Sequence, residues 1–322
     1  MSPLGPLRFR PILRRYLWGN RRLETLGKQL GPGSDYAESW EICDHGGDQS
    51  VVLAGPMAGA TLGELVRGRA ADLFGRGPSA GRFPLLVKFL DAALALSVQV
   101  HPNDAQAARL QPPDLGKTEA WIIVAADPGS VIYAGLRPGV TPEQLADALR
   151  RQTCQDLLHR FSPRPGDCVY LPAGTVHALG QGLVVFEVQQ SSDVTFRLFD
   201  WNRLGPDGKP RPLHVAEGVA AVDFHRGPVN PQELHPTDRP WVSRLVTCEK
   251  FVLERWDFDR PQVLGGDGRF HVVCVLEGAV AIEGDPMAEP MPRGGTALLP
   301  ASAGAVCLAP LGRTILADAF VD

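Results

Sequence analysis

The 322-residue chain lacks the features that mark several protein classes. No pair of its six cysteines has the C-x-x-C spacing of a zinc knuckle or a redox motif. It has no run of 18 apolar residues that would predict a membrane span, and its arginine-containing N-terminus has no apolar stretch long enough for a signal peptide. The net charge of -4 gives no basic footprint for nucleic acid. These absences predict a cytoplasmic protein that binds neither membranes nor nucleic acids.

Glycine and proline, by contrast, are abundant. The chain has 35 glycines and 29 prolines, which favour many short strands joined by turns. Apolar or alternating runs predict strands in much of the chain, including 84–92, 96–100, 118–126 and 130–136, then most of 166–201 and 241–322. Cys168, Cys274 and Cys307 lie in apolar runs and are expected to be small buried hydrophobes.

Helices are predicted only in the first part of the chain. Thr61 and Glu64 have the spacing of a capping box ahead of a helical pattern over 61–75. Thr141 and Gln144 open a second helical pattern over 141–161, as one helix or two.

Proline-rich stretches suggest how the chain divides. One such stretch, 205–214, interrupts the strands, and another, 227–240, has the composition of a linker. A boundary near 236 divides the chain into two domains, 1–236 and 237–322. Both are expected to be antiparallel sandwiches or jelly rolls, with the helices inserted only in the first.

The stretch LSVQVHPND, 96–104, is a strand with one apolar and one polar face. Its polar face carries Ser97, Gln99 and His101, because alternate residues of a strand point the same way. These side chains face either water or a site, and a shift of one residue in register exchanges the two outcomes.

A turn motif downstream offers a partner for that face. GDCVYLPAGTVHALG, 166–180, has the spacing G-x5-P-x-G-x2-H, in which two turns flank a short strand and direct His177 inward. Such a hairpin places an imidazole at the mouth of a β-barrel, where small-molecule sites are common.

The sequence thus contains a mixed set of nitrogen and oxygen donors. Gln99, His101, Glu119 and His177 would suit zinc or another divalent metal with positions left open. A single histidine on a strand is more often structural than a ligand, and Glu119 alone could be a solvated strand residue. The remaining six histidines are interpreted as structural or surface residues: His45, His159, His214, His225, His235 and His271.

Several stretches together resemble the type I mannose-6-phosphate isomerases of the short bacterial kind, which are zinc-dependent cupins. The matching stretches are WGN (18–20), ESWE (38–41), LLVKFLDAALALSVQVHPND (85–104), GKTEAW (116–121), PAGTVHALG (172–180) and EVQQSSDVTFRLFDWNR (187–203). They occur in the family's order over most of residues 1–203. The C-terminal part resembles the family's second, degenerate cupin, where Ala305 follows the turn motif in place of a histidine. A metal is therefore not expected there.

The resemblance implies roles for particular residues. Gln99, His101, Glu119 and His177 would hold one zinc ion per chain. The family's catalytic residues fall on Arg197, Glu187 and Lys117, and its proposed phosphate-binding residues fall on Lys88 and Ser97. A tyrosine found in some members is Leu179 here, so no role for that hydroxyl can be transferred.

Each of these residues also has a structural interpretation. Arg197 could be a strand arginine paired with Asp193 or Asp200, and Lys117, in a turn, could be a solvated surface lysine. Lys88 lies in a buried strand, where a lysine is costly unless it is paired, either with an anionic ligand or with a nearby carboxylate. Glu187 could face inward or outward, depending on register.

The resemblance implies a zinc-dependent aldose-ketose isomerase that interconverts mannose 6-phosphate and fructose 6-phosphate through a cis-enediol. Its partner would be a small sugar phosphate, and the chain is expected to be a monomer or a weak homodimer. Three alternatives stay open from the residues alone. They are a cupin enzyme with iron or another substrate, a non-catalytic sugar-phosphate-binding cupin, and a purely structural sandwich.

Overall fold

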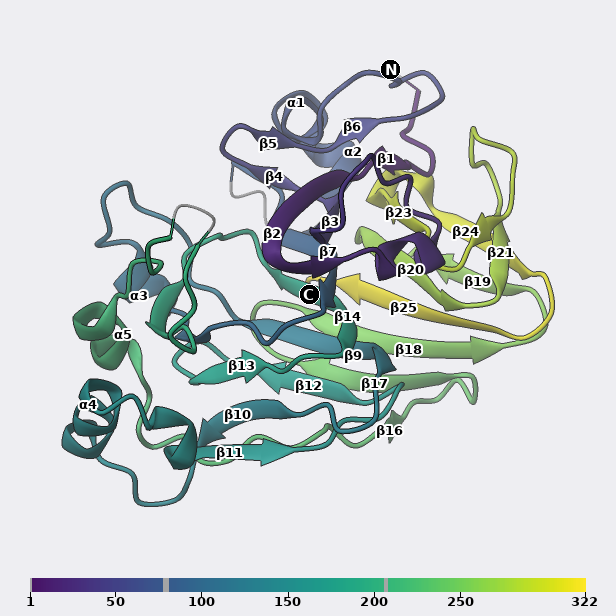
Figure 1. Ribbon diagram of the computed structural model, residues 1–322. Helices are drawn as coiled ribbons and strands as arrows, with labels where there is room; N and C mark the ends of the chain where they lie inside the picture. Colours follow the sequence, from purple (N-terminus) through teal and green to yellow (C-terminus); the bar gives the residue numbers. More distant parts are fainter. Residues whose placement is uncertain (1, 78–80, 206–207) are drawn as a thin grey trace.

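The computed structural model describes residues 2–77, 81–205 and 208–322, and its main feature is two antiparallel strand systems (Figure 1). The first has a six-stranded sheet of, in spatial order, β12 (Cys168–Leu171), β9 (Glu119–Ala126), β14 (Leu183–Gln190), β7 (Leu85–Ala92), β3 (Tyr36–Ile42) and β2 (Ile12–Asn20). Opposite it is a five-stranded sheet of β11 (Leu158–Phe161), β10 (Ile132–Leu136), β13 (His177–Leu179), β8 (Val98–Val100) and β15 (Phe196–Phe199).

The second strand system comes from the C-terminal part of the chain. Its six-stranded sheet contains β16 (His235–Pro236), β17 (Val242–Thr247), β18 (Val252–Phe258), β25 (Thr314–Phe320), β20 (His271–Glu277) and β23 (Thr296–Leu299). Its four-stranded sheet contains β19 (Gln262–Gly265), β24 (Ala305–Pro310), β21 (Ala279–Ile282) and β22 (Met291–Pro292). Two small ribbons near the N-terminus are β1 (Phe9–Arg10) with β6 (Val51–Val52), and β4 (Asp44–His45) with β5 (Asp48–Gln49). The mainly β prediction is confirmed.

Helices are few and short. They are α1 (Leu62–Gly68), α2 (Ala70–Phe74), α3 (Asp104–Ala107), α4 (Pro142–Arg150) and α5 (Val215–Ala221), with 3-10 turns η1 (Arg22–Leu26), η2 (Cys154–Leu157) and η3 (Ala301–Ala303). Both predicted capping boxes form, at Thr61 with Glu64 and at Thr141 with Gln144. No helix of the described ranges is long and apolar enough to cross a membrane.

Two predictions about local structure were wrong. The helical pattern over 141–161 ends early, because Leu158–Phe161 forms strand β11 and pairs with β10. That tertiary pairing outweighs the local helical spacing. Cys307 is only partly buried on β24, whereas Cys168 and Cys274 are buried as expected. Of the proline-rich stretch 205–214, residues 206–207 lie outside the described part.

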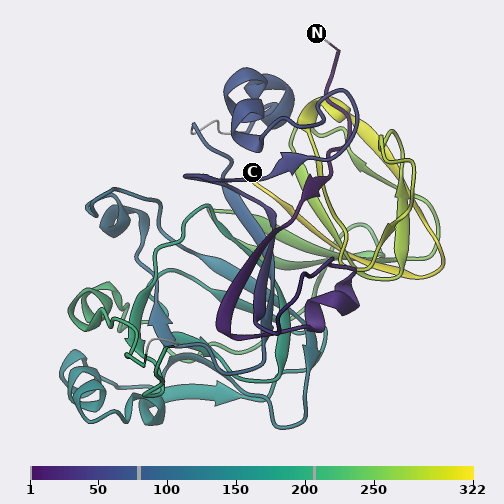
Figure 2. The ribbon, with the colours of Figure 1, turned by 45° about the horizontal axis from the view of Figure 1, so that its top comes forward.

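The two strand systems share one apolar core. Val87 of β7 and Phe186 of β14 belong to the same buried cluster as Leu253 of β18 and Val272 of β20. The two six-stranded sheets therefore pack face to face, and Figure 2 shows the C-terminal strands and the helices α3, α4 and α5 at opposite ends of the molecule. The domain division at 236 stays a prediction.

Alternation along the central strands decides which side chains face away from that core. Val87 and Phe89 pack toward the C-terminal sheet, so Lys88 between them points into the first sandwich. The same alternation turns Glu187 of β14 inward, and Glu187 lies opposite Lys88 in the ladder. On the facing sheet, β8 runs between β13 and β15.

Candidate active site

The interior of the first sandwich holds a cavity of about 280 Å³. Its polar wall comes from both sheets, so one cavity collects residues that are far apart in the sequence. The charged and amide side chains in its lining are Glu38, Lys88, Gln99, Lys117, Glu119, Glu187, Asp193, Arg197 and Arg211. Ser97 also lines it, so the polar face of 96–101 points to a site and not to bulk water.

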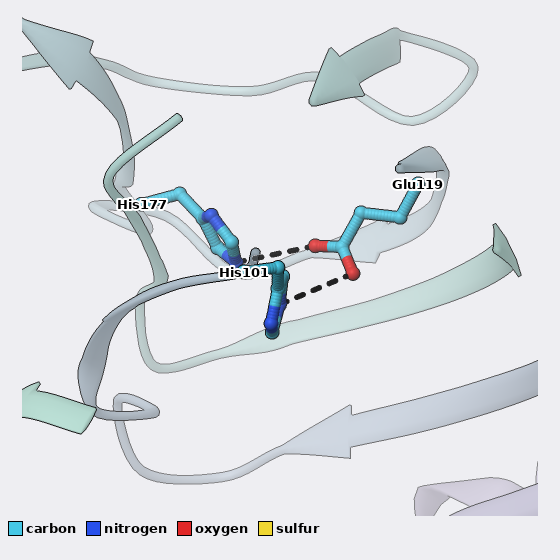
Figure 3. A group of neighbouring side chains, drawn as sticks. All are labelled: His101, Glu119 and His177. Carbon is cyan, nitrogen blue, oxygen red and sulfur yellow. Dashed lines mark ion pairs between the residues drawn. The ribbon is translucent and has the colours of Figure 1, made fainter. Parts of the chain in front are cut away.

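Three predicted ligands, His101, Glu119 and His177, meet at the point where Glu119 lines the cavity. Nε2 of His101 lies 3.4 Å from Oε2 of Glu119, and Nε2 of His177 lies 3.2 Å from Oε1 of the same carboxylate (Figure 3). Their possible ligand atoms all lie within 4.8 Å of one another, and all three side chains are buried. Figure 3 shows both imidazoles converging on the carboxylate of Glu119.

The hydrogen bonds of the two imidazoles leave their Nε2 atoms available. Nδ1 of His101 lies 2.8 Å from the carbonyl of Val194, and Nδ1 of His177 lies 2.9 Å from that of Thr175. Since a carbonyl only accepts, each Nδ1 carries a proton, and in the neutral form of each ring Nε2 presents a lone pair. A backbone partner of this kind fixes the tautomer of a metal-binding histidine.

Buried atoms without partners also fit a cation-binding site. Nε2 of His101 and both carboxylate oxygens of Glu119 are buried and have no hydrogen-bond partner among the described residues. Such groups are costly unless something satisfies them. Burial, followed by the charge of Lys117, lowers the pKa of His101. Burial opposes ionisation of Glu119, but Lys117 and the two imidazoles hold its pKa well below the usual range. A neutral imidazole and an ionised carboxylate are the forms that bind divalent metals.

Gln99 lies next to the His–Glu–His group, but its amide nitrogen faces the group, whereas a metal ligand would present the amide oxygen. Its amide nitrogen lies 3.2 Å from Nε2 of His177, and its oxygen accepts a bond of 3.3 Å from the hydroxyl of Ser97. A half-turn of the amide exchanges the two atoms and brings the oxygen to the cluster. The position of Gln99 fits a fourth ligand, because His177 and Arg197 flank it on the neighbouring strands.

Lys88 is paired with carboxylates. Its ammonium lies 3.3 Å from Glu38 and 3.6 Å from Glu187, and all three residues are buried. Burial works against the charge, but the two carboxylates raise the pKa of Lys88 above its usual value. Burial raises the pKa of Glu187 to about 8, the charge of Glu119 adds to the effect and that of Lys88 opposes it. The side chain of Glu187 therefore faces the interior of the first sandwich. This is one of the two orientations that the sequence allowed.

Lys117 is not a surface residue, so that structural interpretation was wrong. It is buried, and its ammonium lies 3.3 Å from Oε2 of Glu119. Lys117 therefore lies against the carboxylate of Glu119, and Lys88 lies between Glu38 and Glu187.

Arg197 also departs from its structural interpretation. No ion pair joins it to Asp193 or Asp200 among the described residues, and its Nη1 donates instead to the carbonyl of Pro212 at 3.0 Å. Burial, then the nearby charge of Arg211, lower the pKa of Arg197. An arginine without a carboxylate partner at a cavity wall is available to an anion.

Several cavity residues were missed from the sequence as functional candidates. Glu38 was given no role from the sequence, although its alternation with Trp40 in ESWE already placed both on one strand face. Arg211 gave no signal, because it lies in a proline-rich loop without periodicity. Tyr16 and Thr195 also line the cavity.

Comparisons with known proteins point to one family. The model of a family described as phosphomannose isomerase type I, catalytic domain, matches residues 7–122. The mannose-6-phosphate isomerase ManA of Bacillus subtilis (strain 168) is 35% identical over 304 residues, covering 93% of this chain and 94% of the relative. The crystal structure of a mannose 6-phosphate isomerase from Bacillus subtilis superposes with a TM-score of 0.89 at 30% identity, covering 98% of this chain and 99% of that one. A mannose 6-phosphate isomerase bound with zinc and yttrium shares the fold, with a TM-score of 0.78 at 18% identity over 99% of this chain and all of that chain (100%).

Two strand systems, with a buried His–Glu–His group whose Glu119 lines a cavity in the first, define a cupin with a small-molecule site. Within that class, the relatives above 30% identity extend over almost the whole chain. The chain belongs to the type I phosphomannose isomerase family, as its motifs predicted.

Proposed function

We propose that this chain is a zinc-dependent isomerase that interconverts mannose 6-phosphate and fructose 6-phosphate through a cis-enediol. The observation that carries the proposal is the buried group of His101, Glu119 and His177, because its Glu119 lines a cavity that Glu187 and Arg197 also line. The names of its relatives support the choice of substrate.

The reaction moves one proton between C1 and C2 of the open-chain sugar. It needs a base for that proton and a means of stabilising charge on the two oxygens. Zinc, held by Gln99, His101, Glu119 and His177, would act as a Lewis acid toward the carbonyl oxygen. The protein holds the ligands rigidly, because the backbone carbonyls of Val194 and Thr175 orient the two imidazoles.

Glu187 is the candidate that moves the proton, and Lys117 is its competitor. A carboxyl group whose pKa burial raises to about 8 can accept and return a proton near neutral pH. Lys117 has its ammonium 3.3 Å from Oε2 of Glu119, so it already forms an ion pair with a proposed metal ligand. Arg197 would stabilise negative charge on the sugar oxygens, since it has no carboxylate partner within the described structure.

Chelation tests the metal and the activity together. Purified protein is expected to convert mannose 6-phosphate to fructose 6-phosphate, to lose this activity on treatment with a chelator, and to regain it with zinc. Zinc should also raise the melting temperature of the chelated protein, because a ligand that binds only the folded state stabilises it, by about 4 kcal/mol at a thousand times its Kd. Metal-loaded protein without turnover in either direction would contradict the proposed reaction, and recovery with iron but not zinc would contradict the assigned metal.

A further inference from the structure

We propose that Asp104 is a positioning residue for the segment that carries Lys117 and Glu119, and that Lys250 of the C-terminal strand system holds Asp104 in place. The inference rests on the proposed function for the metal and the reaction. It gives the second strand system, where no metal is expected, a part in shaping the site of the first. A chain of hydrogen bonds leads from Lys250 to the backbone beside Glu119.

The carboxylate of Asp104 joins three segments that are far apart in the sequence. Its Oδ1 accepts hydrogen bonds from the amide of Gly116 at 2.8 Å and from Nε2 of Gln190 at 3.0 Å. Its Oδ2 lies 2.7 Å from Nζ of Lys250, which is in the turn between β17 and β18. Burial works against ionisation of Asp104, but its three donors hold the pKa of the carboxyl below the usual range. Asp104 is therefore a charged acceptor at neutral pH, and hydrogen bonds to a charged acceptor are the stronger kind.

Gln190 connects Asp104 to the strand that carries the ligand. Its amide oxygen accepts from the backbone amide of Thr118 at 3.0 Å, and its own backbone amide donates to the carbonyl of Thr118 at 3.1 Å. Thr118 lies between Lys117 and Glu119. Both ends of the buried amide of Gln190 are thus used, one on Asp104 and one on the residue before Glu119.

The backbone at Gly116 is packed directly on the segment that follows His101. A Cβ added to Gly116 would lie 2.5 Å from the amide nitrogen of Asp104, so this position has no room for a side chain. The next amide, of Lys117, donates to the carbonyl of Pro102 at 3.0 Å. The chain leaving one ligand strand and the chain entering the other therefore meet at Asp104, and a shift of this junction would move ligands on both strands.

The ion pair itself has little to contribute to folding stability. The side chains of Lys250 and Asp104 are 32% and 43% exposed, and solvent screens pairs of this exposure. The effect of the pair is therefore expected in the geometry of the ligand segment and not in the melting temperature. This difference separates a positioning role from a merely structural one.

Zinc affinity and turnover of three variants test the inference. Asp104→Ala is expected to weaken zinc binding, measured by competition with a chelator, by about 10- to 100-fold, and to lower kcat by about 10-fold, as is usual when a partner outside the ligand shell is lost. KM for mannose 6-phosphate should stay within about 3-fold, because the cavity side chains are unchanged.

Two milder variants divide the role of the carboxylate. Asp104→Asn keeps the Oδ1 acceptor for Gly116 and Gln190 and should lose no more than about 3-fold in zinc affinity. Lys250→Met should lose about 3-fold by itself, the effect of a half-exposed pair. It should lose nothing further when combined with Asp104→Ala, because its partner is then already gone.

Cobalt gives a readout that does not depend on turnover. Co²⁺ loaded in place of zinc absorbs visible light, and its spectrum follows the number and geometry of its ligands. Asp104→Ala is expected to change this spectrum, and Asp104→Asn to restore it. Asp147→Ala is the matched control, because the side chain of Asp147 is 42% exposed against 43% for Asp104 and pairs with Arg150 and Arg151 at the end of α4. The control should leave zinc affinity, spectrum and kcat unchanged.

Wild-type zinc affinity and a wild-type cobalt spectrum in Asp104→Ala would overturn the inference, and so would a lowered melting temperature as its only effect. Additive losses in the double variant would overturn the part assigned to Lys250. Should Asp104→Ala fail to fold, Lys250→Met carries the test, and wild-type zinc affinity in that variant would overturn the inference. Wild-type protein that binds zinc with this dependence on Asp104 but isomerises nothing would instead overturn the proposed function and leave this inference standing.

Discussion

Replacing His177 with alanine is expected to remove the bound metal and to lower isomerase turnover by on the order of 10³-fold, the equivalent of about 4 kcal/mol of lost stabilisation. The substitution takes one of two imidazoles from a group whose remaining members, His101 and Glu119, are buried. Metal analysis of the purified variant and a turnover assay with mannose 6-phosphate measure the two effects separately.

A histidine outside the cavity provides the comparison for that variant. His225 is exposed and its side chain has no contact with the His–Glu–His group, so His225→Ala should keep both metal and turnover. Full metal content and full activity in His177→Ala would contradict the assignment of the site. Loss of both in His225→Ala would show that the assay reports folding and not ligation.

Replacing Glu187 with glutamine is expected to lower kcat by about 10²–10⁴-fold, the usual contribution of a positioned acid or base. The amide keeps the size of the side chain but cannot take the proton. Lys88 keeps Glu38 as its partner at 3.3 Å, so the fold and the metal should survive. Turnover, metal content and melting temperature are measured on the same preparation.

Lys117→Met distinguishes the competing base. If Glu187 moves the proton, the Lys117 variant should still exchange the substrate's C2 proton with solvent, whereas Glu187→Gln should not. The opposite pattern would transfer the role to Lys117. Near-normal kcat in Glu187→Gln would exclude that carboxylate as the base.

Much of the candidate metal site could be predicted from the sequence, because short-range rules act on its parts. Alternation along 96–101 placed Ser97, Gln99 and His101 on one face, and the turn motif set the direction of His177. The family resemblance then selected Glu119 among many strand carboxylates. The register of β8 between β13 and β15 confirms that the polar face points inward.

Contacts between residues that lie far apart in the sequence were harder to predict. Glu38 and Lys88 are 50 positions apart, and their pairing depends on the packing of β3 against β7. Sequence reasoning could say only that Lys88 required an anion, and the structure supplies two carboxylates. Arg211 is in a loop whose course is set by backbone bonds to Arg197, and no local pattern of residues encodes that course.

Strand β11 was mistaken for helix for a related reason. The apolar spacing of 141–161 continues the helical pattern of α4 to the end. Residues 158–161 nevertheless pair with β10 as a β-strand, and Leu158 is fully buried there. Non-local hydrogen bonds thus outweigh a local preference that is worth little per residue.

The most direct test of the account follows the transferred proton. Zinc-loaded protein is incubated with mannose 6-phosphate in deuterium oxide, and the product is examined by NMR. The account predicts fructose 6-phosphate that carries deuterium at C1, because the C2 proton passes through a protein base that exchanges with solvent. The absence of fructose 6-phosphate would contradict the proposed function, and product formed wholly without deuterium would contradict the enediol route.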